Sequence, residues 1–125
     1  MARAFTLLTP SEIVFGRGKI AELNEHASRV GRRALVVHGR SPERLAPVFE
    51  RLTDIEVVQT LSVSKEPDID TLTAAIETGK SLGVDLVMGI GGGSVMDSAE
   101  LLAAMLPSRS DLMDHLEVVG KGLPL

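Results

Sequence analysis

Three short apolar runs, separated by segments with helical spacing, set the pattern of this chain. The runs are ALVVH (34–38), IEVVQT (55–60) and DLVMGI (85–90), and none of them alternates strictly between apolar and polar residues. Strands of a parallel sheet have this pattern, because helices cover both faces of the sheet. The sequence therefore predicts three buried parallel strands.

Apolar residues at helical spacing predict three helices around these strands. Gly31 is expected to end the first helix and Pro107 the third. Asp68 or Asp70 is expected to cap the start of the second helix. The three apolar stripes are Ile20, Leu23, Ala27 and Val30; Leu72, Ala75, Ile76 and Gly79; and Val95, Ala99, Leu102, Ala103 and Leu106.

Residues 42–53 form a less regular segment. Ser41 and Pro42 suit the N-cap and the first position of a helix. Pro47 would then lie inside the helix, where it lacks an N–H donor and must kink or restart it.

Alternation of strands and helices predicts the fold class: α/β, a Rossmann-like parallel sheet with helices on both faces. The segments FTLLT and EIVFG (12–16) precede it, separated by Pro10 and Ser11. We expect them to form an N-terminal extended arm or hairpin.

Composition narrows the class of protein. The 125 residues are 44% hydrophobic, which is enough for one domain with a core. Thirteen basic and seventeen acidic residues give a net charge of −4, so we expect no nucleic-acid partner. Cysteine is absent, which excludes disulfides and thiolate metal sites. No apolar run approaches the roughly 20 residues of a membrane span, and MARAFTLLTP lacks signal-peptide features, so we predict a cytoplasmic protein with no membrane partner.

Two segments fall where an α/β sheet binds its ligand, beyond the carboxyl ends of the strands. They are HGRS (38–41) and GGGS (91–94). Three glycines let a ligand approach the backbone, and Ser94 suits the N-cap of the next helix. Free N–H groups and the positive helix end would then bind a phosphate or pyrophosphate. The alternative is that the glycines only make a tight strand-to-helix turn.

Two standard phosphate motifs are incomplete here. The dinucleotide fingerprint needs a third glycine, but Ser94 stands at that position. The P-loop ending Gly79-Lys80-Ser81 has Ala74 in place of the first glycine, and it closes a predicted helix instead of following a strand.

Polar residues near the glycines remain open to two interpretations. Asp97 has capping-box spacing from Ser94, or it could contact a ribose or an amide. Glu100 lies on the same side, where two carboxylates could serve acid–base chemistry or simply be solvated. His38, at the end of a predicted strand, is a candidate ligand contact. His26 and His115 are expected to be solvated, and no pair of histidines has metal-ligand spacing.

The segment GGGSVMDSAE resembles the GGGSxxDxAK signature of the iron-containing (group III) alcohol dehydrogenases, whose relatives include glycerol dehydrogenase, maleylacetate reductase and dehydroquinate synthase. EIVFGRGKIAEL (12–23) and ALVVHGRS resemble the family's first strand and helix and its second nucleotide-contact strand. The resemblance implies that residues 1–125 are an N-terminal nucleotide-binding domain, a dehydroquinate synthase-like N-terminal domain that begins with the extended arm or hairpin. In that family an Asp and three His of a C-terminal helical domain hold iron or another divalent metal, and neither that domain nor the family's threonine- and glycine-rich stretch is in this sequence.

The same resemblance implies a function for the complete protein and an inactive chain as given, truncated near GKGLPL. The complete protein would be a metal-dependent NAD(P)-linked oxidoreductase that transfers hydride between the nicotinamide and a small alcohol, aldehyde or other carbonyl substrate. A maleylacetate-reductase-like or glycerol-dehydrogenase-like member is an alternative. The substrate itself stays open, since its pocket would lie largely in the helical domain.

Site residues also follow from the resemblance. Gly91, Gly92, Gly93 and Ser94 would bind the coenzyme pyrophosphate, and Asp97 would lie near the nicotinamide. NAD-preferring members often carry an Asp where this chain has Gly39, followed by Arg40 and Ser41. Without that carboxylate, Arg40 could pair with a 2′-phosphate, so we predict NADP over NAD.

This chain departs from the family pattern at two places. Glu100 replaces the lysine that ends the signature, which reverses a charge beside the coenzyme site. Lys65-Glu66-Pro67 falls where many members carry Asn-Pro.

Two readings from other classes stay open. The chain could be an autonomous, non-enzymatic flavodoxin-like module that binds a phosphate or regulates a partner, with a natural stop after Leu125. Its arm could also pair with a second copy, since an unpaired strand edge invites another chain and the family resemblance implies a homodimer through this region.

Overall fold

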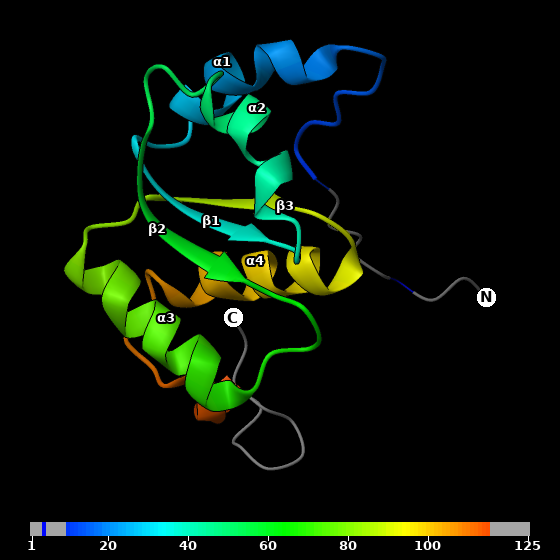
Figure 1. Ribbon diagram of the computed structural model, residues 1–125. Helices are drawn as coiled ribbons and strands as arrows, with labels where there is room; N and C mark the ends of the chain where they lie inside the picture. The colour runs from blue at the N-terminus through cyan, green and yellow to red at the C-terminus, as the bar shows by residue number, and fades with distance from the viewer. Residues whose placement is uncertain (1–3, 5–9, 116–125) are drawn as a thin grey trace.

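The computed structural model describes residue 4 and residues 10–115. These residues form a three-stranded parallel sheet in the order β2-β1-β3 (Figure 1). The strands are β1 (Arg33–His38), β2 (Glu56–Ser62) and β3 (Leu86–Ile90). All three predicted strands and the predicted α/β fold are therefore confirmed.

The central strand β1 explains why its sequence is apolar without alternation. Ala34, Leu35, Val36 and Val37 are all 0% exposed. Leu35 and Val37 pack into one hydrophobic cluster, whereas Ala34 and Val36 pack into another on the opposite face of the sheet. Helices cover both faces, so neither side of the strand needs polar residues.

The edge strand β2 differs from the prediction that all three strands are buried. Its residues are half-buried or exposed, and none of the seven is fully buried. Within the described chain β2 pairs only with β1, so its outer edge is free. A shift in register between Ala34 and Leu35 places Val58 in a bulge opposite β1.

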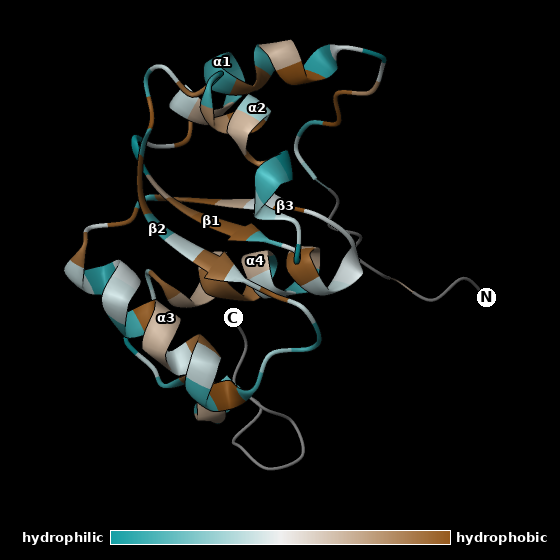
Figure 2. Ribbon diagram, in the orientation of Figure 1, coloured by the Kyte–Doolittle hydropathy of each residue, from teal (hydrophilic) through white to brown (hydrophobic). Residues whose placement is uncertain are grey.

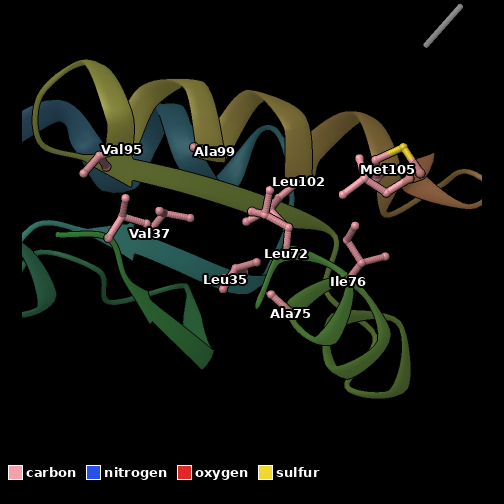
Figure 3. Close-up of a cluster of buried hydrophobic side chains, with 11 residues drawn as sticks. Leu35, Val37, Leu72, Ala75, Ile76, Val95, Ala99, Leu102 and Met105 are labelled. Carbon is pink, nitrogen blue, oxygen red and sulfur yellow. The ribbon is translucent and has the colours of Figure 1, made fainter. Parts of the chain in front are cut away.

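Helices α3 (Ile69–Ser81) and α4 (Gly93–Met105) cover one face of the sheet, together with the short helix η3 (Leu112–His115). Figure 3 shows side chains from β1, α3 and α4 converging in this layer. The short helices η1 (Lys19–Glu22), α1 (Leu23–Ser28), η2 (Pro42–Arg44) and α2 (Ala46–Phe49) lie on the other side (Figure 1). Hydrophobic residues follow the strands and the helix sides turned toward them (Figure 2).

Helix α3 confirms its prediction most closely. The Asp68 side chain accepts a hydrogen bond of 2.7 Å from the Thr71 N–H, so Asp68 and not Asp70 is the N-cap. All four residues of the predicted stripe are buried: Leu72, Ala75, Ile76 and Gly79.

Helix α4 ends as expected, since Leu106 is its C-cap and Pro107 follows. The predicted stripe is less accurate at its end, because Ala103 is exposed and Leu106 is only half-buried, while Met105 is 1% exposed.

The first predicted helix is only partly correct. Ala27 is buried, but Ile20 is 46% and Val30 69% exposed. The segment begins as the 3₁₀ helix η1 and becomes α-helical only at Leu23. Because a 3₁₀ helix has three residues per turn, Ile20 rotates away from the face that Ala27 buries.

The sequence also predicted an N-terminal extended arm or hairpin. Residues 12–16 form no strand and no hairpin with described residues, and Phe15 is 95% exposed. FTLLT lies outside the described residues.

The restart predicted at Pro47 is confirmed: η2 ends at Arg44, and α2 begins at Ala46 with Pro47 in its first turn. No helix among the described residues is long and apolar enough to cross a membrane.

Candidate functional site

The two loops singled out in the sequence lie side by side at the carboxyl edge of the sheet. His38 and Ile90 end β1 and β3 and are register partners, so residues 39–41 and 91–93 emerge next to each other (Figure 1). They enclose a pocket of about 370 Å³, which we call the β1–β3 pocket. Its lining residues are His38, Gly39, Arg40, Ser41, Arg44, Leu45, Ile90, Gly91 and Gly92.

Glycine occupies the positions at this edge for different physical reasons. A Cβ on Gly91 would lie 2.8 Å from Cγ2 of Val95, so packing inside the chain requires glycine there. A Cβ on Gly39, Gly92 or Gly93 would meet nothing within 4 Å. At these positions the chain itself tolerates a side chain, and the absence of one leaves the backbone open to a ligand.

Helix α4 begins two residues earlier than the sequence suggests, since Ser94 was the predicted N-cap. Its N-cap is Gly92, with φ −89° and ψ −161°, and no described side chain caps it. The prediction that Ser94 is the N-cap is therefore wrong, and so is the capping-box reading of Ser94 with Asp97. Ser94 already has a helical backbone as the second residue of α4, where its hydroxyl cannot bond the first-turn amides as an N-cap does.

This uncapped start gives the site its electrostatic character. The first N–H groups of a helix have no partner within the helix, and the helix dipole adds partial positive charge at the same place. The amides of Gly93 and Ser94 lie in this first turn. The start of a 13-residue helix, with no carboxylate in its first turn, favours an anion such as a phosphate.

A second pocket of about 270 Å³ lies on the other side of the glycine loop, between α3 and α4. We call it the α3–α4 pocket. Ser94 and Asp97 line it, whereas the other predicted residues, apart from Gly93, line the β1–β3 pocket. Its lining residues are Glu66, Pro67, Leu72, Ser94, Asp97, Ser98 and Leu101.

The two pockets carry opposite charge. Arg40 and Arg44 line the β1–β3 pocket, and Glu66 and Asp97 line the α3–α4 pocket. Arg44 was missed from the sequence, although its position four residues after Arg40 was a usable signal. Glu100 is exposed and lines neither pocket.

His38 and His26 lie in different environments. His38 is 8% exposed, and its Nδ1 lies 2.7 Å from the Gly39 carbonyl oxygen. His26 lies beside Glu12 and Glu22, at 3.1 Å and 3.5 Å, and takes no part in either pocket. Among the described residues no group of three or more His, Cys, Asp and Glu side chains could hold a metal ion.

Comparison with known proteins adds the family. The family model for iron-containing alcohol dehydrogenase matches residues 10–125. The chain belongs to the iron-containing alcohol dehydrogenase family. This match confirms the resemblance drawn from the glycine motif and its upstream strands.

Individual relatives of this family agree with the match. NADH-dependent butanol dehydrogenase A of Clostridium acetobutylicum is 31% identical over 120 residues, which cover 91% of this chain and 31% of that protein. The NADPH-dependent aldehyde reductase of Escherichia coli is 30% identical over 122 residues, covering 94% of this chain and 32% of that protein. The chain therefore spans about a third of the length of these curated relatives.

Solved structures agree as well. The crystal structure of NADH-dependent butanol dehydrogenase A from Thermotoga maritima matches with a TM-score of 0.67 and 31% identity, over 89% of this chain and 30% of that one. Sulfoacetaldehyde reductase from Bifidobacterium kashiwanohense, solved in complex with NAD⁺, matches with a TM-score of 0.75, covering 94% of this chain and 32% of that one. Its identity of 19% supports the fold alone.

Proposed function

We propose that this chain is the coenzyme-binding domain of a metal-dependent, NAD(P)-linked oxidoreductase that acts on a small alcohol or aldehyde. Family membership supports the reaction class. The observation that carries the proposal is the glycine loop at the start of α4, where Gly92 and Gly93 have open space and no described side chain caps the helix. The family match favours this function over a non-enzymatic regulatory module.

In this proposal the loop binds the coenzyme pyrophosphate. Gly92 and Gly93 let the pyrophosphate approach the backbone, and Gly91 lines the same pocket. The amides of the first turn, including that of Ser94, donate hydrogen bonds to the pyrophosphate. The coenzyme supplies the hydride chemistry, and the residues of this chain bind and orient it.

The charge difference between the pockets gives the coenzyme a direction. The α3–α4 pocket, with Glu66 and Asp97, disfavours phosphate and suits the nicotinamide and its ribose. The β1–β3 pocket, with two arginines, suits the adenosine end of the coenzyme. Glu66 in this pocket replaces the asparagine of many family members, and as a carboxylate it can only accept hydrogen bonds, whereas an asparagine side chain also donates them.

We further propose that the coenzyme is NADP. Gly39 leaves no carboxylate against a 2′-phosphate, and Arg40 and Arg44 lie at the same pocket. A guanidinium binds a phosphate through charge-assisted hydrogen bonds and keeps its charge at any ordinary pH. Ser41 adds a hydroxyl to the same lining.

A titration of the chain with NADPH and then NADH, followed by amide chemical shifts, tests both proposals. Shifts at residues 91–94 are expected with both coenzymes, and shifts at residues 39–41 with NADPH only. Arg40→Ala is expected to weaken NADPH binding about tenfold, or roughly 1.4 kcal/mol, without affecting NADH. Arg109→Ala, at an exposed site outside both pockets, is the matched control. Absence of shifts at residues 91–94 up to several millimolar coenzyme would contradict the proposed site.

The metal that the family name implies does not fit the described residues, because no group of ligating side chains is present among them. We propose that the substrate and metal are bound outside this domain in a longer protein, and that the chain alone does not turn over an alcohol or aldehyde. A coenzyme-linked absorbance assay of the chain tests this, and measurable turnover would contradict it.

We also propose that the complete protein is cytoplasmic and that it forms a homodimer through the N-terminal arm. Ile13 and Phe15 are 79% and 95% exposed, and the arm borders an open pocket of about 460 Å³ against η1 and α1. Such exposed apolar side chains favour association with another surface. Imaging of the tagged protein tests the location, and a membrane or exported pool would contradict it.

A further inference from the structure

His38 occupies an unusual place for a titratable side chain. It ends the central strand β1, is 8% exposed, and lines the β1–β3 pocket. Its backbone is fixed by the sheet, because the His38 carbonyl accepts a hydrogen bond of 2.7 Å from the Val63 N–H. The ring is therefore held at the base of the pocket instead of reaching out from a loop.

The contact to Gly39 defines which ring nitrogen carries a proton. His38 Nδ1 lies 2.7 Å from the Gly39 carbonyl oxygen, and a carbonyl oxygen can only accept. Nδ1 must therefore carry the hydrogen, both in the neutral ring and in the charged one. The bond persists whichever of these forms is present.

This hydrogen bond fixes the orientation of the next peptide unit. In a trans peptide the C=O of Gly39 and the N–H of Arg40 point in opposite directions, and the described chain contains no cis peptide. Since the Gly39 carbonyl faces the buried ring, the Arg40 N–H points away from it. No described group accepts a hydrogen bond from that N–H.

Glycine makes such an external restraint necessary. Gly39 has no Cβ and nothing lies within 4 Å of where one would be, so its peptide rotates more freely than that of other residues. If the Gly39–Arg40 peptide turned over, a carbonyl oxygen would replace the N–H and repel an anion.

From this geometry we infer that His38 is a positioning residue for the 2′-phosphate of the coenzyme. It holds the Gly39–Arg40 peptide so that the Arg40 N–H, together with the guanidinium groups of Arg40 and Arg44, binds the phosphate. The inference rests on the proposed coenzyme site, but it assigns to a buried residue a role in choosing between NADP and NAD.

Two variants separate this role from a merely structural one. His38→Phe keeps a ring of similar size and lacks the donor, whereas His38→Asn keeps an N–H donor close to the position of Nδ1. Affinities for NADPH and NADH are measured on the full chain by titration, with amide shift dispersion as the check on folding.

We expect His38→Phe to weaken NADPH binding about tenfold while NADH binding changes less than about twofold. We expect His38→Asn to recover most of the NADPH affinity, and the Arg40 amide shift on NADPH binding to be lost only in His38→Phe. Equal affinities of His38→Phe and wild type for NADPH would overturn the inference, while NADH shifts at residues 91–94 would still support the proposed coenzyme site. Parallel loss of both coenzymes in both variants would also overturn it.

A measurement on the wild-type chain also tests the inference, and it does not depend on whether a variant folds. Nitrogen chemical shifts of the imidazole rings distinguish the two neutral tautomers. We expect His38 in its neutral form to be the Nδ1–H tautomer. A neutral ring protonated at Nε2 would overturn the inference, because Nδ1 could not then donate to Gly39.

Discussion

Adjacent glycines at the start of α4 serve different purposes. Gly91 packs so closely against Val95 that no side chain fits, while Gly92 has open space around it and a backbone conformation that other residues adopt. Val95 is β-branched and 4% exposed, so it cannot easily move aside. The first glycine therefore serves the fold, and the second is available to serve a ligand.

Alanine at these two positions should separate stability from binding. Gly91→Ala is expected to lower the free energy of unfolding by about 1–3 kcal/mol, the usual cost of overpacking a core. Gly92→Ala is expected to leave unfolding nearly unchanged and to weaken coenzyme binding, because its methyl group occupies the space of the pyrophosphate. Chemical denaturation and coenzyme titration of both variants measure this. Equal effects of the two substitutions on stability would contradict it.

Asp85 joins the start of β3 to the start of β1. Its carboxylate accepts hydrogen bonds of 2.8 Å from the backbone N–H groups of Arg33 and Arg32, and these bonds lower the pKa of Asp85 below its ordinary value of 3.8. A carboxyl group whose pKa is lower in the folded state stabilises the fold above its unfolded pKa. That contribution is lost as the pH falls below 3.8 and through the folded pKa.

We therefore expect Asp85→Asn to lower the unfolding midpoint at neutral pH. The difference from wild type should shrink as the pH falls below 3.8, because the wild-type carboxylate is then protonated as well. Thermal unfolding followed at several pH values measures this, with Asp111→Asn as an exposed control. A difference that stays constant with pH would show that charge on Asp85 contributes nothing.

At the scale of elements, α4 connects the candidate site to the core. Its first turn forms the proposed anion site, and its buried side packs on β3 and against the cluster that includes Leu35 and Val37. Leu102, in the middle of this side, is 0% exposed (Figure 3). The packing of α4 therefore fixes where its N-terminus lies relative to the strand ends.

Leu102→Ala is expected to lower the free energy of unfolding by about 2–5 kcal/mol, because it removes buried methyl groups and leaves a cavity. Met96→Ala, on the same helix but at a residue that is 44% exposed, should have a smaller effect. Denaturant unfolding of both variants compares them. Similar losses would mean that α4 does not pack as described.

At the scale of the whole molecule, the sheet places opposite charges on the two sides of one glycine loop. The arginines come from the segment after β1, Glu66 comes from the loop before α3, and Asp97 comes from α4. A ligand with an anionic end and an uncharged end would therefore bind in one direction only. The exposed arm, at Ile13 and Phe15, lies outside both pockets and is free for an interface.

If that interface joins two copies, Phe15→Asp should shift the chain from dimer to monomer in sedimentation equilibrium. A charge at the centre of an apolar contact is costly to bury. Met113→Asp, at a residue that is 43% exposed on η3, is the matched control and should stay dimeric. A monomeric wild type, or a dimeric Phe15→Asp, would contradict the proposed arm-mediated dimer.

Local patterns in the sequence were sufficient for most elements. The run 34–38 predicted the central strand because burial on both faces leaves no polar positions. Helix α3 was predicted with two candidate caps, Asp68 and Asp70, and the structure has Asp68, which bonds an N–H only three residues away. The segments 39–41 and 91–94 were also placed at one edge of the sheet, since parallel strands end on the same side. These features depend on short-range geometry.

Other features required the tertiary structure. Strand β2 lies at the edge because of the strand order, and no pattern within the run 55–60 predicts that order. The uncapped start of α4 depends on how Gly91 packs against Val95, so Ser94 was misplaced as a cap. That Arg44 shares a pocket with Gly91 and Gly92 became visible only when the strand ends were brought together. The contact of His38 with Gly39 depends on the orientation of a side chain, which the sequence does not record.

The sequence by itself determined the class of fold, the three strands and the two loops of the candidate site, because each depends on the character of neighbouring residues. Only the tertiary structure decided which residues share a pocket, and which glycine is packed inside the chain and which has open space, because those depend on distances in the folded chain.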